Sequence, residues 1–151
     1  MEKFQEKLDD LLVSVYYNLL RLEENVLKKG RLELSISEMH LIEQVGKVPD
    51  EGLTIREIAA RLGITSPSVT VAVQKLVRKD YVRKTACVHD GRAVKVHLTK
   101  KGMNVDAYHK YSRRLMTKAL AEGLTDPEKD VLLRAVQKLI DYFSEGIGEK
   151  A

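Results

Sequence analysis

The segment 65–79 displays polar side chains whose chemistry suits contact with a nucleic acid. Hydroxyl, amide and cationic groups of this kind donate hydrogen bonds to phosphate oxygens and to the edges of bases. Apolar residues recur in the same segment at helical spacing, which predicts one face packed on the protein and one face turned outward. The predicted DNA contacts on the outward face are Ser66, Ser68, Thr70, Gln74, Lys75 and Arg78.

The local sequence predicts how this helix begins and what precedes it. Ser66 is expected to cap it, and Pro67 brings a preset φ to its first position. Upstream, Thr54 and Glu57 form a capping-box pattern that opens a short helix, and Gly63 ends that helix. Two short helices joined by a glycine-containing turn predict a helix-turn-helix. An ordinary pair of packed helices in another small α protein is the alternative.

Two β-prone runs, 82–88 and 93–98, flank an Asp90-Gly91 turn and predict a β-hairpin. Alternate positions of the second run are apolar, so one face can pack on the helices while the other meets solvent or a polyanion. A hairpin after a recognition helix predicts a wing. Arg92, steadied by Asp90, is predicted to enter a minor groove, because narrow A·T-rich stretches attract guanidinium groups. Lys95 is a further predicted DNA contact.

Three stretches carry a family resemblance: residues 76–82 (LVRKDYV), 90–92 (DGR) and 98–102 (LTKKG). Their order resembles that of the MarR family of winged-helix transcriptional regulators, whose wing signature is D-x-R followed by an L-T-x-x-G helix start. The resemblance covers nearly the whole chain. Asp80 departs from the family pattern, which usually has Gly there. Asp is one of the few residues that tolerate the left-handed conformation that a helix end often needs.

The resemblance also implies what regulates the protein. Residues 37–40, 70–73 and 76–79 are most similar to the subgroup that represses fatty-acid synthesis genes and senses acylated carrier protein. The implied function is a repressor on a pseudo-palindromic operator in double-stranded DNA, modulated by an acylated carrier protein or by a small, lipid-like molecule; absence of any ligand stays open. Core or dimer packing explains the candidate effector residues equally well. Those candidates are Tyr16, Met39, His40 and Tyr108.

The charge distribution agrees with a local DNA-binding surface. The chain of 151 residues has a net charge of +4. Residues 54–102 contain eleven Lys or Arg and three acidic residues, a net of +8, which leaves a net of −4 elsewhere. A positive field confined to the predicted DNA-binding segment favours displacement of counterions from phosphates. A solvated basic face without a partner is the alternative.

Long amphipathic helices are predicted at both ends of the chain. Residues 4–28 would form a helix of about 37 Å, longer than a monomer of this size needs to cover its core. Thr99 is expected to cap a later long helix that Gly123 closes, and Thr125 to cap a last one. In the MarR family such terminal helices interlock, so a homodimer is expected.

The predicted fold class is mainly α (α+β), a winged helix-turn-helix with long N- and C-terminal dimerisation helices. Residues 1–151 are expected to form a single MarR-like domain. Within it, residues 54–99 would be the DNA-binding lobe, and residues 4–29 and 102–145 the dimerisation helices.

Other function classes have weaker support in the sequence. Glu24, His40 and His109 could converge on a metal, as in family members that sense zinc, but there is no H-x-x-x-H pair and no cysteine cluster. A redox sensor would depend on Cys87 alone, which lies on a predicted wing strand. No phosphate-binding glycine loop or nucleophile motif indicates an enzyme. We therefore predict no metal ligand, no cofactor and no catalytic residue, and a winged-helix module for protein contact stays as the other alternative.

The sequence also bears on where the protein resides. No segment is long and apolar enough to span a bilayer, and no secretory signal pattern is evident at the N-terminus. A single cysteine cannot form an internal disulfide. These features predict a cytoplasmic protein that does not bind membranes.

Overall fold

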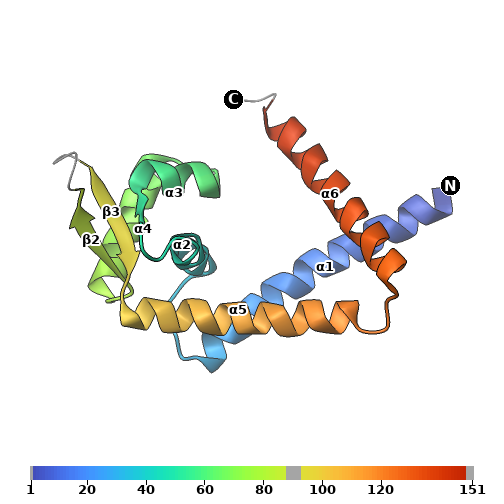
Figure 1. Ribbon diagram of the computed structural model, residues 1–151, viewed down its shortest axis with the longest axis horizontal. Coiled ribbons are helices and arrows are strands. Elements are labelled where there is room, and N and C mark those ends of the chain that lie inside the picture. Colours follow the sequence, from blue (N-terminus) through green and yellow to red (C-terminus); the bar gives the residue numbers. More distant parts are fainter. Residues whose placement is uncertain (1, 88–92, 149–151) are drawn as a thin grey trace. The chain divides into compact units, whose positions relative to one another are not determined.

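The computed structural model describes residues 2–87 and 93–148 (Figure 1). It is mainly helical, with one small sheet, and has the winged helix-turn-helix fold that the sequence predicts. By internal contacts the chain divides into two compact units, Met1–Ser112 and Arg113–Ala151. The elements are α1 (Glu2–Lys29), α2 (Ile36–Gly46), β1 (Leu53–Thr54), α3 (Ile55–Leu62), α4 (Ser66–Arg78), β2 (Val82–Ala86), β3 (Val94–Leu98), α5 (Lys100–Ala121) and α6 (Asp126–Gly148).

The sheet is antiparallel, with strand order β1-β3-β2. β2 and β3 form the predicted hairpin, in which Val82 pairs with Leu98 and Ala86 with Val94. β1 was not predicted, because its two residues are too few to show an alternating pattern. It is a strand only because Leu53 lies opposite Val96 of β3. The sheet thereby ties the segment before α3 to the wing.

The core of the first unit lies between α2, α3, α4 and the sheet. Its most deeply buried side chains come from each of these elements, so removal of any one of them would leave a cavity. The expected packing face of β3 is confirmed at Val96 and Leu98, but Val94 is exposed. The largest of the fully buried side chains are Met39, Leu41, Ile42, Ile58 and Leu76.

Capping interactions set most of the predicted helix starts. At α3, the Glu57 N–H donates to Thr54 Oγ1 (3.2 Å) and the Thr54 N–H donates to Glu57 Oε2 (2.7 Å), which confirms the capping box. The prediction that Ser66 caps α4 is wrong. Thr65 is the cap, because its extended backbone places Oγ1 where it accepts from the Ser68 N–H at 3.3 Å. Ser66 is consequently the first residue of the helix.

Left-handed backbone occurs where helices end. Gly63 closes α3 with φ of 64°, and Asp80 follows α4 with φ of 63°, as predicted for a residue that replaces the usual glycine. After α1, which ends at Lys29, the left-handed residue is Arg31, with φ of 50°. The Gly30 N–H still donates to the Val26 carbonyl in helical fashion, so the chain reverses one residue later.

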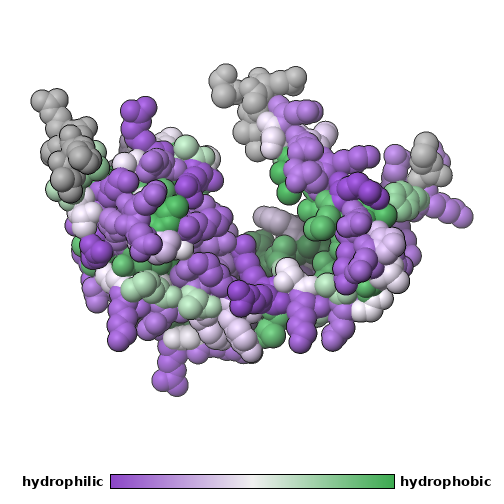
Figure 2. All heavy atoms as spheres, viewed as in Figure 1, coloured by the Kyte–Doolittle hydropathy of each residue, from purple (hydrophilic) through white to green (hydrophobic). Residues whose placement is uncertain are grey.

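The long terminal helices carry exposed apolar side chains, each helix described by itself. On α1 every described residue before Leu20 is exposed, although many are apolar. On α6 the apolar residues are likewise at the surface, as Figure 2 shows in green. The exposed apolar residues of these two helices include Phe4, Leu8, Leu11, Val15, Tyr16, Val131, Leu133, Val136, Ile140 and Phe143.

Candidate nucleic-acid interface

Helix α4 is held on the protein by one fully buried face. Val69, Val73 and Leu76 have no exposed surface, and they lie three and four residues apart. Helix α3 and strand β2 pack against α4 (Figure 1). A helix fixed in this way presents its outward side chains in a constant orientation, which direct reading of a DNA groove requires.

The outward face of α4 divides into side chains that are already bonded and side chains that have no bonding partner. The Thr70 hydroxyl donates to the Ser66 carbonyl (3.0 Å), and the Ser68 hydroxyl lies 2.8 Å from Thr65 Oγ1. In the described part of the chain Gln74, Lys75 and Arg78 form no hydrogen bond or ion pair, and all three are exposed. These last three have their full donor capacity available for a ligand.

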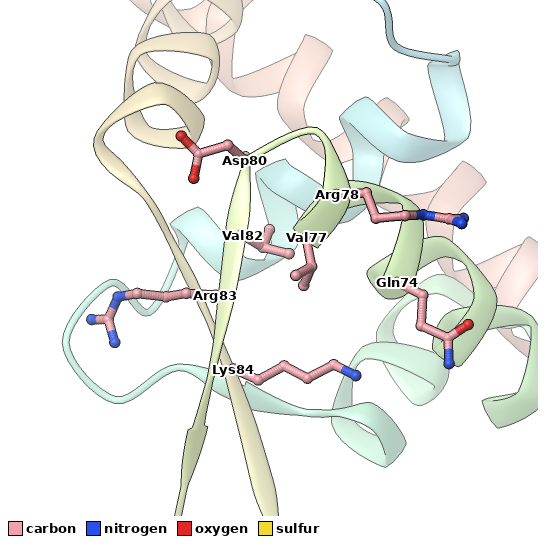
Figure 3. A pocket seen from close by; sticks show the side chains of 7 residues that line it. All are labelled: Gln74, Val77, Arg78, Asp80, Val82, Arg83 and Lys84. Atoms are coloured by element: carbon pink, nitrogen blue, oxygen red, sulfur yellow. The ribbon is translucent and has the colours of Figure 1, made fainter.

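A groove of about 620 Å³ lies between the C-terminal half of α4 and strand β2 (Figure 3). Figure 3 shows Gln74, Arg78 and Lys84 on the α4 side of β2, whereas Asp80 and Arg83 project on the other side of the strand. Sequence reasoning missed Lys84. The sequence did indicate that Lys84 shares a face with Val82, because the two are two residues apart and strand side chains alternate between faces. Val82 is buried in the structure.

The two wing residues predicted to touch DNA are Arg92 and Lys95. Arg92, together with Asp90, lies outside the described residues. Lys95 is half-buried in the middle of β3, paired with Thr54 on one side and Thr85 on the other. Its charge acts on Glu57 of α3.

The carboxyl of Glu57 lies at the N-terminus of α3. The backbone N–H of Thr54 donates to it, and this hydrogen bond is the main reason that its pKa is lowered. The Thr54 hydroxyl and the positive charges of Lys95 and Arg61 lower it further. Glu57 therefore stays ionised and caps the helix throughout the neutral range.

The C-terminal end of α4 is fastened to the rest of the first unit by charged and polar contacts. Lys79 Nζ lies 2.9 Å from the buried carboxylate of Glu38 on α2. Lys101 donates to the Lys79 carbonyl (2.8 Å), and its ammonium lies 4.2 Å from the centre of the Tyr81 ring. These contacts join the recognition helix to both α2 and α5.

Thr99 supports the same junction. Its hydroxyl donates to the Asp80 carbonyl (2.6 Å) and accepts from the Gly102 N–H (3.1 Å), which confirms its predicted role at the start of α5. A Cβ at position 102 would overlap the Tyr81 carbonyl oxygen, so only glycine permits this close approach. The start of α5 is thus packed directly against the turn that ends α4.

The structure does not bring the four candidate effector residues into one cavity. Met39 is buried in the core, Tyr16 is exposed on α1, and His40 Nε2 lies 3.0 Å from Glu23 Oε1. Tyr108 lines a cavity of about 330 Å³ together with the last residue of α1, residues that follow α1 and others on α5. Of the four, only Tyr108 lines one of the described cavities.

The histidines that could have held a metal lie beside a different glutamate from the one expected. Glu23, and not Glu24, is near His40 and 3.7 Å from His109 Nε2, because Glu24 is exposed and lines a separate cavity. His109 Nδ1 lies 3.7 Å from Glu43. Within residues 2–87 and 93–148 no group of three or more His, Cys, Asp or Glu could hold a metal ion. No described helix is long and apolar enough to cross a membrane.

Comparison with known sequences gives one family match. Residues 32–93, which include α2, α3, α4 and β2, match the sequence model of the MarR family. No curated protein matches the chain significantly.

Solved structures with the same fold include DNA complexes. Streptococcus pneumoniae FabT in complex with DNA is 30% identical, with a TM-score of 0.86 over 93% of this chain and 97% of that chain. The S. aureus MepR–DNA complex is 19% identical, with a TM-score of 0.72 over 89% and 96%. S. aureus MepR bound to ethidium bromide is 18% identical, with a TM-score of 0.67 over 89% and 95%. Because MepR is only 18–19% identical in sequence to this chain, its likeness shows the fold alone.

Proposed function

This chain belongs to the MarR family, and we propose that it acts as a homodimeric repressor that binds a pseudo-palindromic operator in double-stranded DNA. The observation that carries the proposal is the contrast between the two faces of α4. One face has no exposed surface, and the other presents Gln74, Lys75 and Arg78 without bonding partners among the described residues. The DNA complex of the related FabT supports the same role for this chain.

Each exposed residue of α4 has a role that follows from its chemistry. Gln74 carries an amide, which can donate to and accept from the edge of adenine at the same time. Lys75 and Arg78 supply positive charge for guanine or for phosphates. Ser66, Ser68 and Thr70 lie at the N-terminal end, where hydroxyls and free helix N–H groups approach the backbone of a DNA strand.

A second copy of the chain would explain the exposed apolar surface of the terminal helices. Leu11 and Val15 of α1 are each 54% exposed, and α6 has a comparable apolar surface. A two-fold dimer would place its two recognition helices in successive major grooves about 34 Å apart. An effector would then act by favouring a dimer geometry with a different spacing, provided that it binds that geometry more tightly. We propose an acylated carrier protein or a small, lipid-like molecule as the effector class.

The test is a fluorescence-anisotropy titration with an operator recovered by in vitro selection. We expect saturable binding that requires both half-sites and weakens steeply with salt. Gln74→Ala should weaken operator binding about 10-fold and relax the preference at one base pair in each half-site, because an amide contact discriminates bases by about 1–3 kcal/mol. Weak, sequence-indifferent binding by the unmodified protein would contradict the proposal and would favour a winged-helix module for protein contact.

A further inference from the structure

The α4–β2 groove combines an apolar floor with a positively charged rim. Its floor is formed by Val77 of α4, which is 40% exposed, and by Val82 of β2, which is buried. Its rim on the α4 side carries Arg78 and Lys84 (Figure 3). Valine side chains cannot form hydrogen bonds, so this floor cannot donate to or accept from the polar groups of base edges. It suits an apolar group that is flanked by negative charge.

The positive groups on this rim are available for a ligand. Among the described residues, neither Arg78 nor Lys84 forms a hydrogen bond or an ion pair, and both are exposed. Of the described residues that line the groove Asp80 alone is acidic, and Figure 3 shows its carboxylate on the opposite side of β2. The two cations are therefore not neutralised within the groove.

The register of the hairpin determines where Lys84 lies. Lys84 is paired with Val96, whose side chain is fully buried, so Lys84 belongs to the face of the sheet that turns toward α4. Figure 3 shows its side chain extending from β2 toward the part of α4 that carries Gln74. A residue on the wing thereby contributes to the surface of the recognition helix.

We propose that the α4–β2 groove holds one sugar–phosphate segment of the bound DNA, with Lys84 and Arg78 paired with phosphate oxygens and Val77 packed against a deoxyribose. A DNA strand offers this combination, because an anionic phosphate lies on either side of each largely apolar sugar. The Arg78 guanidinium can bind two phosphate oxygens at once, and the Lys84 ammonium acts as a point charge. This inference rests on the proposed DNA-binding function and assigns Lys84 to it.

Such a site adds affinity without adding sequence preference, and this consequence can be measured. Lys84→Gln should weaken binding to the operator and to an unrelated duplex by the same factor, about 5-fold to 10-fold at moderate salt. It should also reduce the slope of log K against log salt concentration by about 1, the contribution of one phosphate contact. Lys100→Gln is the matched control, since Lys100 is exposed, lies outside the groove and loses the same charge. An equal effect of both variants would overturn the site and indicate a general field effect.

Operator duplexes with one neutral methylphosphonate linkage locate the contacted phosphate. The unmodified protein should lose affinity at one or two linkages in each half-site, and Lys84→Gln should be insensitive at the linkage that Lys84 contacts. If Lys84→Gln keeps the full sensitivity at every linkage, the proposed contact does not exist. Competition with pyrophosphate gives a further check. If pyrophosphate binds in a Lys84-dependent way while DNA affinity does not depend on Lys84, the groove is a site for free anions and the proposal is wrong.

The same titrations separate this inference from the proposed function. If Gln74→Ala weakens operator binding and Lys84→Gln does not, the DNA-binding function stands and the groove assignment falls. If the unmodified protein shows no specific duplex binding, the proposed function itself falls.

Discussion

Glu57 is a cap that also responds to pH. Its carboxylate accepts from the Thr54 backbone N–H, and this lowers its pKa below the ordinary value of 4.5. A lowered pKa in the folded state means that its contribution to stability is complete above about pH 4.5 and is lost as the pH falls through the lowered value. We expect Glu57→Gln to make the free energy of unfolding depend less steeply on pH as the pH falls below about 5.

Urea unfolding followed by circular dichroism at several pH values measures this difference. Glu51→Gln is the control, since Glu51 is exposed and its side chain forms no hydrogen bond among the described residues. Identical pH profiles for Glu57→Gln and the unmodified chain would show that the cap does not contribute to acid stability.

The sequence predicted which residues of α4 are exposed better than it predicted which hydrogen bonds they form. The helical spacing of the apolar residues was enough to predict that Gln74, Lys75 and Arg78 are exposed, because a helix repeats with one fixed period and so separates its apolar face from its polar face. It could not show that the Thr70 hydroxyl donates to its own helix backbone, which competes with donation to a ligand. Lys84 was missed because alternation within the strand shows only that it shares a face with Val82, whereas the packing of that face beside α4 follows from the pairing of β2 with β3.

A charged pair joins α2 to the end of α4. Glu38 is buried, and Lys79 is its ion-pair partner at 2.9 Å. We expect Lys79→Met to lower the free energy of unfolding by about 1–2 kcal/mol, because it leaves a buried carboxylate without its countercharge; partial exposure of Lys79 reduces the effect. Urea denaturation measures this change.

A double variant tests whether the effect comes from the pair. Glu38→Gln keeps an oxygen that can accept from the Ser35 N–H, so it retains the cap of α2 while it removes the charge. Combined with Lys79→Met it should cost less than the sum of the two single variants. Strict additivity would mean that Glu38 and Lys79 do not stabilise each other.

The helices were easier to predict than the strands and the turns of the chain. Capping boxes are local signals, and the one predicted at Thr54 is found in the structure. β1 is defined by a neighbour that is more than 40 residues away in the chain, so no local pattern could indicate it. At α4 two adjacent residues, Thr65 and Ser66, can both cap, and only the backbone conformation decides between them.

The exposed apolar surface of the terminal helices α1 and α6 predicts self-association. We expect the chain to form a dimer of twice its 17.1 kDa mass, and the double variant Leu11→Arg/Val15→Arg to be a monomer. These side chains are each 54% exposed, and charges at their positions would lose solvation in an interface. Size-exclusion chromatography with light scattering measures the mass.

Glu6→Arg is the control for this experiment, because Glu6 is exposed on the same helix but lies on the opposite side of it from Leu11 and Val15. It should leave the mass unchanged. A dimer of the double variant would show that α1 does not form the interface, and a monomeric unmodified chain would exclude a stable homodimer.

Helix α5 runs from the first compact unit into the second. Its 22 residues have no proline and no glycine after Gly102, so it forms a rod of about 33 Å. Its N-terminal end is packed against the turn that follows the recognition helix, and its other end belongs to the second compact unit. A tilt of about 5° over such a length displaces one end relative to the other by about 3 Å, close to the rise of one base pair. An angular change this small at the start of α5 would therefore correspond to a displacement of about one base-pair step.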